Sequence, residues 1–310
     1  MIKEDSAVAL ASEDFHRARA REIVSRILSV FTGRKDELLS FAAVKDILRP
    51  SSESYRGIRA VPLELIVGSE GRYRDFTRSF LPRHRHMRGR WMSIGAARYR
   101  DVNLPPVRLY EIGGVYFIRD GNHRVAVARQ HRVEFIDAEI TALDTYFRAS
   151  PDMTHESLVA AVIEYERQRF VSATGIDDLL RGVDIQFTSP GRYDLLLSQI
   201  QEQRRRLSGG NGQASMEDAV RLWYDSAYRP LVDLVVRERL LSAFPGRTAA
   251  DLYAWIVQHW ELLKSKYGAH YPIVDAVRDF AGKYRRPWLH RILDRLRGRR
   301  APVGEDGKGP

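Results

Sequence analysis

Five consecutive residues, Asp120-Gly121-Asn122-His123-Arg124, combine backbone freedom and side chains that could bind an anion. They stand where a β-rich stretch gives way to a run of small apolar residues, so a strand is expected to turn into a helix there. The first turn of a helix has unpaired backbone N–H groups and the positive end of the helix dipole, which together attract phosphate. Glycine permits close backbone approach, asparagine tolerates left-handed backbone, and histidine and arginine donate to phosphate oxygens. The pattern therefore predicts a phosphate-binding loop with Gly121, Asn122, His123 and Arg124 as ligands.

Two members of this loop are also candidates for chemistry. Asp120 could hold Mg²⁺ or orient the loop, and both Asp120 and His123 are candidate catalytic groups. The competing interpretation is a capped turn whose polar residues are incidental.

A second segment, residues 68–76, could supply further groups to the same ligand. It follows a predicted strand and contains Glu70 as a candidate general base and Arg72 as a candidate phosphate clamp. The alternative for this segment is an ordinary surface turn.

The net charge of +10 is concentrated in two segments. Residues 72–100 contain nine arginines against one aspartate, and residues 281–300 contain seven arginines and one lysine against one aspartate. A uniformly basic surface is therefore not expected, whereas two local anion-facing patches are. Within the first patch, the candidate contacts for nucleic acid are four arginines: Arg83, Arg85, Arg88 and Arg90. A solvated charged face is the alternative for each patch.

The elements around the loop form a compact unit in the sequence. Residues 107–112 and 115–118 have strand-like composition and flank Gly113-Gly114, which predicts a β-hairpin. Residues 123–130 follow as a helix and residues 133–140 as another strand, while residues 15–31 predict a helix upstream and residues 50–54 a loop. From residue 154 onward, apolar residues recur at helical spacing, for example in 216–241 and 248–266.

These patterns predict an α+β protein with a small mixed sheet. We expect an N-terminal helical segment at 1–56, a mixed domain at 57–145, a helical domain at 154–285, and a basic amphipathic helix with a disordered tail at 286–310. The segment 286–300 could contact a membrane surface or nucleic acid. The aromatic residues of the helical domain are expected to form its core, with a nucleic-acid stacking platform as the alternative.

The stretch from Leu104-Pro105-Pro106 through Asp120-Gly121-Asn122-His123-Arg124 resembles the ParB/sulfiredoxin superfamily. The resemblance covers roughly residues 58–142 and implies a ParB/sulfiredoxin-like fold that binds ATP or another nucleotide together with Mg²⁺. In sulfiredoxins the position that matches Asn122 is a catalytic cysteine, so the resemblance does not imply sulfinic-acid reduction here. Free serine kinases of the superfamily carry a similar loop, and partition ParB proteins bind CTP and clamp DNA. The whole chain also resembles bacterial proteins of unknown function that join a ParB-like domain to a helical domain.

Composition removes several classes of chemistry. The chain has no cysteine, which excludes disulfides, thiolate catalysis and Cys-based metal sites. No apolar run reaches the length of about 20 residues that spans a bilayer, so the cytoplasm is the expected compartment.

Three functions remain open from the sequence. The first is a nucleotide-binding protein with ATP-dependent phosphoryl-transfer or hydrolase activity. The second is a DNA-binding regulator or nuclease-like protein without nucleotide turnover. The third is a scaffold in which the loop is only structural.

Overall fold

The computed structural model describes residues 3–32, 37–209 and 214–283. The chain divides into two compact units between Val162 and Ile163. The division falls within α5 (His155–Thr174), whereas the sequence placed the boundary at residues 146–153. The fold is mixed α+β, as predicted, with the sheet in the first unit. Among the helices of the described ranges, none is both long and apolar enough to cross a lipid bilayer.

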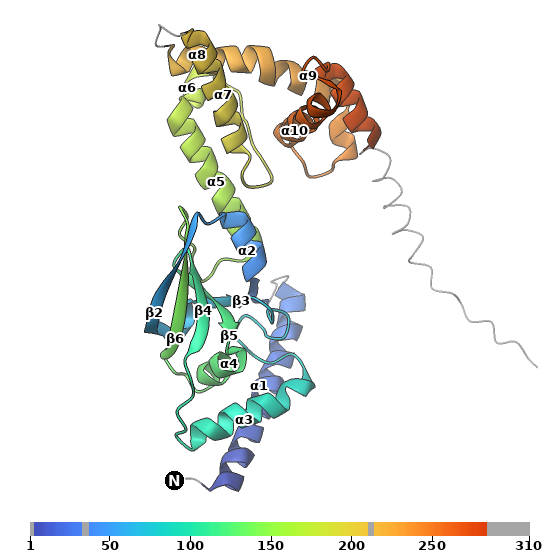
Figure 1. The fold of residues 1–310 in the computed structure, drawn as a ribbon. Coiled ribbons are helices and arrows are strands. Elements are labelled where there is room, and N and C mark those ends of the chain that lie inside the picture. The colour runs from blue at the N-terminus through green and yellow to red at the C-terminus, as the bar shows by residue number, and fades with distance from the viewer. Residues whose placement is uncertain (1–2, 33–36, 210–213, 284–310) are drawn as a thin grey trace, which may run out of the picture. The chain divides into compact units, whose positions relative to one another are not determined.

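The first unit is built around a six-stranded sheet in the order β1-β3-β5-β4-β6-β2, with the long strand β2 on one edge (Figure 1). The sheet is mixed: β1–β3, β3–β5 and β4–β6 are parallel, and β4–β5 and β6–β2 are antiparallel. Its elements follow one another as α1 (Glu4–Thr32), β1 (Leu39–Ser40), α2 (Phe41–Leu48), β2 (Ser52–Pro62), η1 (Leu63–Leu65), β3 (Ile66–Ser69), η2 (Arg85–Met87), α3 (Arg88–Tyr99), β4 (Val107–Ile112), β5 (Val115–Asp120), α4 (Asn122–Gln130) and β6 (Phe135–Asp144).

Helices cover both faces of the sheet. On one face, Phe41 of α2 stacks on Tyr110 with ring centroids 4.3 Å apart and also contacts Phe117. On the other face, α1, α3 and α4 bury a separate core in which Trp91 of α3 and Val125 of α4 are almost inaccessible to solvent. Neighbouring residues of β4 and β5 alternate between these two cores.

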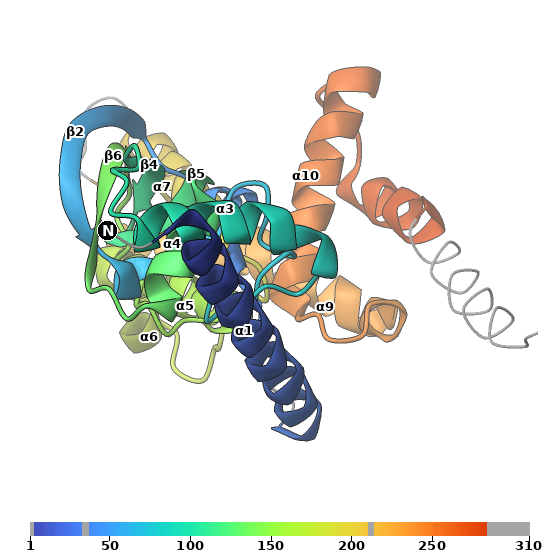
Figure 2. The same cartoon turned by 90° about the horizontal axis from the view of Figure 1, so that it is seen from below.

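Helices α1 and α3 cross at close range on the second face (Figure 2). A Cβ atom placed on Gly95 would lie 2.9 Å from Cβ of Ala11, so the absence of a side chain at Gly95 permits the approach. Helix α1 begins at Glu4, so the predicted helix at 15–31 covers only its second half.

The predicted hairpin is confirmed. Gly113 and Gly114 both have positive φ, at 64° and 86°, which is the backbone that a two-residue hairpin turn of type I′ requires. The turn joins β4 to β5 and so sets the position of Asp120 at the end of β5.

Two local predictions were wrong. Residues 52–54 were expected in a loop, but they form the start of β2, because β6 pairs with them from Ser52↔Asp144 onward and satisfies their backbone groups. The predicted helix at 216–241 is interrupted: α8 (Met216–Trp223) passes through a π-helical turn, η3 (Tyr224–Tyr228), into α9 (Arg229–Arg237). Hydrophobic periodicity does not register a single widened turn of this kind.

The described residues of the second unit form helices and loops around an aromatic core. Trp223, Tyr228 and Tyr253 are buried, and Gln199 accepts hydrogen bonds from both Trp223 Nε1 and Tyr253 Oη. The prediction that aromatic residues of this part build its core is confirmed for these three. The remaining elements are α6 (Ile176–Leu179), α7 (Tyr193–Ser208), η4 (Leu240–Ala243) and α10 (Ala249–Tyr267).

Candidate phosphate-binding site

The turn from β5 into α4 has a backbone that only glycine adopts without strain. Gly121 has φ +103° and ψ 22°, and a Cβ atom there would lie 2.6 Å from Cγ1 of Val107. Val125 N donates to Gly121 O over 3.0 Å, which is the first hydrogen bond of α4. The backbone N–H groups of Asn122, His123 and Arg124 precede it, and the N-cap residue Gly121 has no side chain to cap them.

Strand β3 carries a second segment to the same place. It lies parallel to β5 with Ser69 opposite Ile118, so both strands end at the same edge. The buried Ser69 hydroxyl donates to Ile118 O and accepts from Arg72 N, each over 3.3 Å. This anchors the backbone of Arg72 beside the loop.

A cavity of about 440 Å³ lies at the N-terminus of α4, and we call it the α4 cavity. It is bounded by the loop, by the segment after β3 and by the start of α3. Its lining residues are Arg72, His86, Met87, Arg90, Ile94, Asp120, Gly121, Asn122, His123 and Arg124.

Two buried side chains on the wall of the α4 cavity are unsatisfied. Asn122 is only 8% exposed, yet its Oδ1, a hydrogen-bond acceptor, is buried without a partner among the described residues. His123 is likewise partly buried, and its Nδ1 is buried without a partner among those residues, while its ring packs edge-on against Phe76. Leaving a buried polar group unpaired costs about 1–3 kcal/mol. Such groups are expected where a ligand completes the bonding.

The electrostatics of the cavity are positive. Burial, and after it the charges of Arg72 and Arg90, lower the pKa of His123 from 6.5 to about 4. His123 is therefore neutral at pH 7, because the cavity opposes a further positive charge. Arg90 has no hydrogen bond or ion pair with any described residue, and Arg72 faces only Asp75, at 3.5 Å. An anion in the cavity would meet two arginines with little competition.

Arg124, predicted as a phosphate ligand, is engaged elsewhere. Its Nη1 donates to the carbonyl oxygens of Pro105 and Pro106, and its Nη2 donates to Asp120 Oδ2 over 2.7 Å. The guanidinium thus clamps the end of β5 to the chain before β4. Its main role in this structure is to position the loop, although it still forms part of the cavity wall.

Asp120, the candidate Mg²⁺ ligand, is also engaged by another residue of the loop. Its side chain is 69% exposed and pairs with Arg124, and it contributes the only carboxylate among the residues that line the α4 cavity. Within the described ranges, no group of three or more His, Asp or Glu side chains could hold a metal ion. A protein-held Mg²⁺ site is therefore not supported by the donor set, whereas a metal carried by a nucleotide's own phosphates needs few protein ligands.

Glu70, the candidate general base, lies outside the α4 cavity. Burial, and after it the charge of Glu70, raise the pKa of Tyr110. Tyr110 stacks on Phe41 on the α2 face of the sheet, and the guanidinium of Arg119 lies over its ring. Glu70 follows Ser69 directly, and successive side chains of a strand point to opposite faces. The structure brings Arg72 to the loop and leaves Glu70 away from it.

The four arginines proposed for nucleic acid differ in their surroundings. Arg83 lies 4.0 Å from Glu37, and Arg88 donates to Ser12 Oγ over 2.9 Å. Arg85 and Arg90 are exposed and have no hydrogen bond or ion pair with described residues. The basic segment at 286–300 and the tail to 310 lie outside the described residues.

No family model, curated protein or solved structure matches this chain. The resemblance to ParB/sulfiredoxin proteins therefore stays a prediction.

Sequence reasoning missed part of the cavity wall. His86, Met87 and Ile94 line the cavity from η2 and α3, about 30 residues upstream of the loop. In the sequence His86 lies among arginines, at Arg83, Arg85, Arg88 and Arg90. The same arginine-rich surroundings suit an anion.

Proposed function

We propose that this protein binds a nucleotide, with a phosphate group held in the α4 cavity. The observation that carries the proposal is Nδ1 of His123, which is buried without a partner among the described residues, on a wall that also presents Arg72 and Arg90. These groups surround free backbone amides at a helix N-terminus.

Each component suits a phosphate oxygen. The amides of the first turn of α4 donate, and the helix dipole favours negative charge at this end. The amide nitrogen of Asn122 and a neutral His123 ring can also donate, while Arg72 and Arg90 supply charge and further donors. Burial of Asn122 and His123 strengthens these bonds, because the surroundings are less polar than water.

The proposed ligand is a nucleotide such as ATP, and Mg²⁺ would enter coordinated to its phosphates. The cavity is larger than one phosphate group requires, and the loop resembles nucleotide-binding loops of the ParB/sulfiredoxin type. The proposal concerns binding. Of the three candidate catalytic groups, Asp120 and His123 line the cavity and Glu70 does not.

Calorimetric titration with inorganic phosphate, ATP and CTP, with and without Mg²⁺, tests this proposal. We expect saturable binding to the wild type and a loss of about ten- to a hundredfold in affinity in Arg90→Ala, since one charge-assisted hydrogen bond contributes about 1.5–3 kcal/mol. Arg85→Ala is the matched control, because Arg85 is exposed on the same basic segment but does not line the cavity. No heat with any of the three ligands, or equal effects of the two substitutions, would refute the proposal.

Nucleic-acid binding is the second candidate, and the exposed, unpartnered Arg85 and Arg90 favour it. If these arginines contact DNA phosphates, the logarithm of affinity falls with the logarithm of salt concentration, and each contact contributes a slope of about 0.9. Electrophoretic shifts over a salt series, with Arg85→Ala and Arg90→Ala, measure this slope. An affinity that does not depend on salt would exclude the candidate.

A further inference from the structure

A second cavity, of about 620 Å³, adjoins the α4 cavity, and Ile94 and Arg124 line both. We call it the α3–β6 cavity, because α3, the loop 101–106, α4 and β6 enclose it. A ligand whose phosphate occupies the α4 cavity could extend past Arg124 into this second space.

The chemistry of the α3–β6 cavity differs from that of its neighbour. Asp101 and Asp137 lie on its wall and offset the charges of Arg98 and Arg124 there, so this cavity lacks the positive excess of the α4 cavity. Phe135, on the same wall, is 54% exposed and offers a flat apolar surface. This combination suits an uncharged organic group with a planar part.

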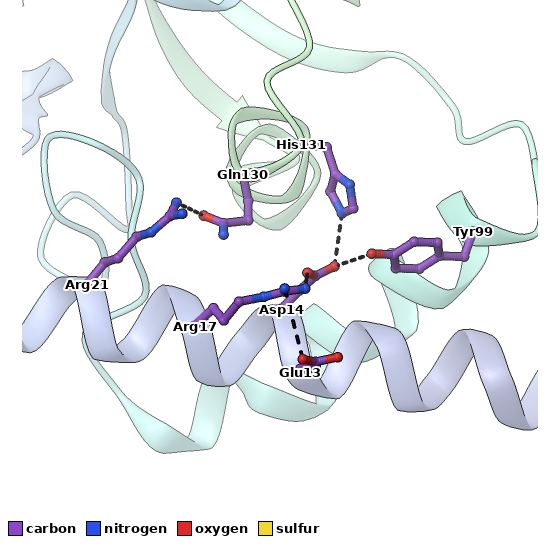
Figure 3. Close-up of polar contacts among 7 residues, drawn as sticks. All are labelled: Glu13, Asp14, Arg17, Arg21, Tyr99, Gln130 and His131. Carbon is purple, nitrogen blue, oxygen red and sulfur yellow. Dashed lines mark hydrogen bonds and ion pairs between the residues drawn. The ribbon is translucent and has the colours of Figure 1, made fainter.

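A buried carboxylate holds one residue of this wall in a defined orientation. Asp14 of α1 is 5% exposed, and its carboxylate accepts hydrogen bonds from Tyr99 Oη at 2.6 Å and from Arg17 Nη2 at 2.7 Å. His131, which lines the α3–β6 cavity, places its Nε2 3.2 Å from Asp14 Oδ2 (Figure 3).

This contact fixes which ring nitrogen of His131 carries the proton. The groups facing the ring are Asp14 and Arg17 from α1 and Arg98 and Tyr99 from α3, and burial outweighs Asp14 so that the pKa of His131 falls below its ordinary value of 6.5. A neutral imidazole has a single N–H, and the Asp14 oxygen requires it on Nε2. Nδ1 then has a free lone pair. Nδ1 lies on the side of the ring away from Asp14 (Figure 3), and no residue of the described ranges bonds to it.

We infer that the α3–β6 cavity holds the nucleoside part of the ligand, and that Nδ1 of His131 accepts a hydrogen bond from an N–H or O–H of that nucleoside. His131 is thus a specificity-determining residue, and Asp14 is a positioning residue that acts through it. The planar base lies against Phe135. This inference rests on the proposed function, since it needs a phosphate in the α4 cavity.

The test compares inorganic phosphate, ribose 5-phosphate and the 5′-monophosphates of adenosine, guanosine, cytidine and uridine by calorimetry on the full chain. At least one nucleoside monophosphate is expected to bind more than about tenfold tighter than inorganic phosphate, because stacking of a base contributes about 1–3 kcal/mol. Phe135→Ala changes an exposed side chain and is expected to remove most of that advantage without changing the affinity for inorganic phosphate.

Asp14→Asn tests the positioning role. An amide at this position can donate to Nε2 and thereby move the ring proton to Nδ1, the change of tautomer that also disables a catalytic histidine when its partner aspartate becomes asparagine. We expect the advantage of the nucleoside monophosphate to fall by about tenfold or more, with unchanged phosphate binding. The imidazole ¹⁵N shifts of His131 should report the exchange of tautomers. Tyr99→Phe is the matched control: it removes one hydrogen bond from the same carboxylate and leaves the tautomer unchanged.

The experiments distinguish failure of the nucleoside subsite, failure of the role of His131 and failure of phosphate binding itself. If inorganic phosphate binds but no nucleoside monophosphate binds tighter, the nucleoside subsite is refuted and the phosphate site stands. If Asp14→Asn changes the tautomer and keeps the full advantage of the nucleotide, the role of His131 is refuted. If neither phosphate nor any nucleotide binds, the proposed function itself fails, and the inference fails with it.

Discussion

Arg124 Nη2 donates a hydrogen bond to Asp120 Oδ2 over 2.7 Å, across the turn that joins β5 to α4. The same guanidinium also bonds to the carbonyl oxygens of Pro105 and Pro106. One side chain therefore connects the end of β5, the start of α4 and the segment before β4. The loop that faces the α4 cavity is held in place before any ligand arrives.

Arg124→Ala should lower stability as well as affinity. Removing the guanidinium leaves two proline carbonyls and one carboxylate without their donor, and we expect the free energy of unfolding to fall by about 1–3 kcal/mol. Chemical denaturation measures this, with Arg90→Ala as the control that loses affinity and keeps its stability. If Arg124→Ala keeps wild-type stability and loses only phosphate binding, Arg124 is a ligand and not a clamp.

Gly121→Ala should destabilise the turn. An L-residue in left-handed backbone costs about 1–2 kcal/mol, and the new Cβ would also lie 2.6 Å from Cγ1 of Val107. The melting temperature is expected to fall, and Gly121→Ala with Val107→Ala should lose less stability than the two single changes added together. Gly71→Ala is the control, because no atom lies within 4 Å of its added Cβ. Equal melting temperatures for the two alanine variants would contradict this account of the turn.

The protein should lose stability in mild acid through His123. Its pKa in the folded chain is about 4, below the ordinary 6.5, so the unfolded chain takes up a proton first as the pH falls. The free energy of unfolding therefore decreases as the pH drops from about 6.5 to about 4, by at most about 1.4 kcal/mol for each pH unit. The free energy of unfolding, measured by chemical denaturation over this range, should change less with pH in His123→Gln than in the wild type or in His84→Gln. Identical slopes in all three proteins would contradict the assigned pKa.

Two glycines of α3 should respond in opposite directions to alanine. Gly89 has open space around it, so Gly89→Ala is expected to raise stability by up to about 1 kcal/mol through helix propensity. Gly95 packs against Ala11 of α1, where a new Cβ would lie 2.9 Å from Ala11 Cβ. Gly95→Ala should therefore lower stability and increase hydrogen exchange in α1. A stabilised Gly95→Ala protein would show that α1 does not pack on α3 at this distance.

The features that the sequence predicted correctly have local signals. Gly113-Gly114 indicates a hairpin because a two-residue turn between adjacent strands requires positive φ at both positions, which glycine adopts readily. Gly121 before a run of small residues indicates a strand that enters a helix for the same reason. The order of the sheet was not predictable in this way, since β2 and β6 pair across more than 70 residues of chain.

The parts of the site that sequence reasoning missed depend on distant partners. Asp14 and Tyr99 are 85 residues apart, and neither forms a motif with His131. Arg124 was predicted to be a ligand because it lies in the loop. Its actual partners, the carbonyl groups of Pro105 and Pro106, precede β4, and no sequence pattern connects them to the loop. Glu70 was assigned to the site because it is near Arg72 in sequence, but β3 ends at Ser69 and the chain bends between the two residues, so that only Arg72 lines the cavity.

The central claim is that phosphate binds at the N-terminus of α4, and amide NMR spectra recorded during a titration with inorganic phosphate test it most directly. We expect saturable shifts of the backbone amide signals of Asn122, His123 and Arg124, and much weaker shifts at the same concentrations when Arg72 and Arg90 are both alanine. The claim is contradicted if these three signals stay in place in the wild-type protein while phosphate is raised to concentrations that shift other signals.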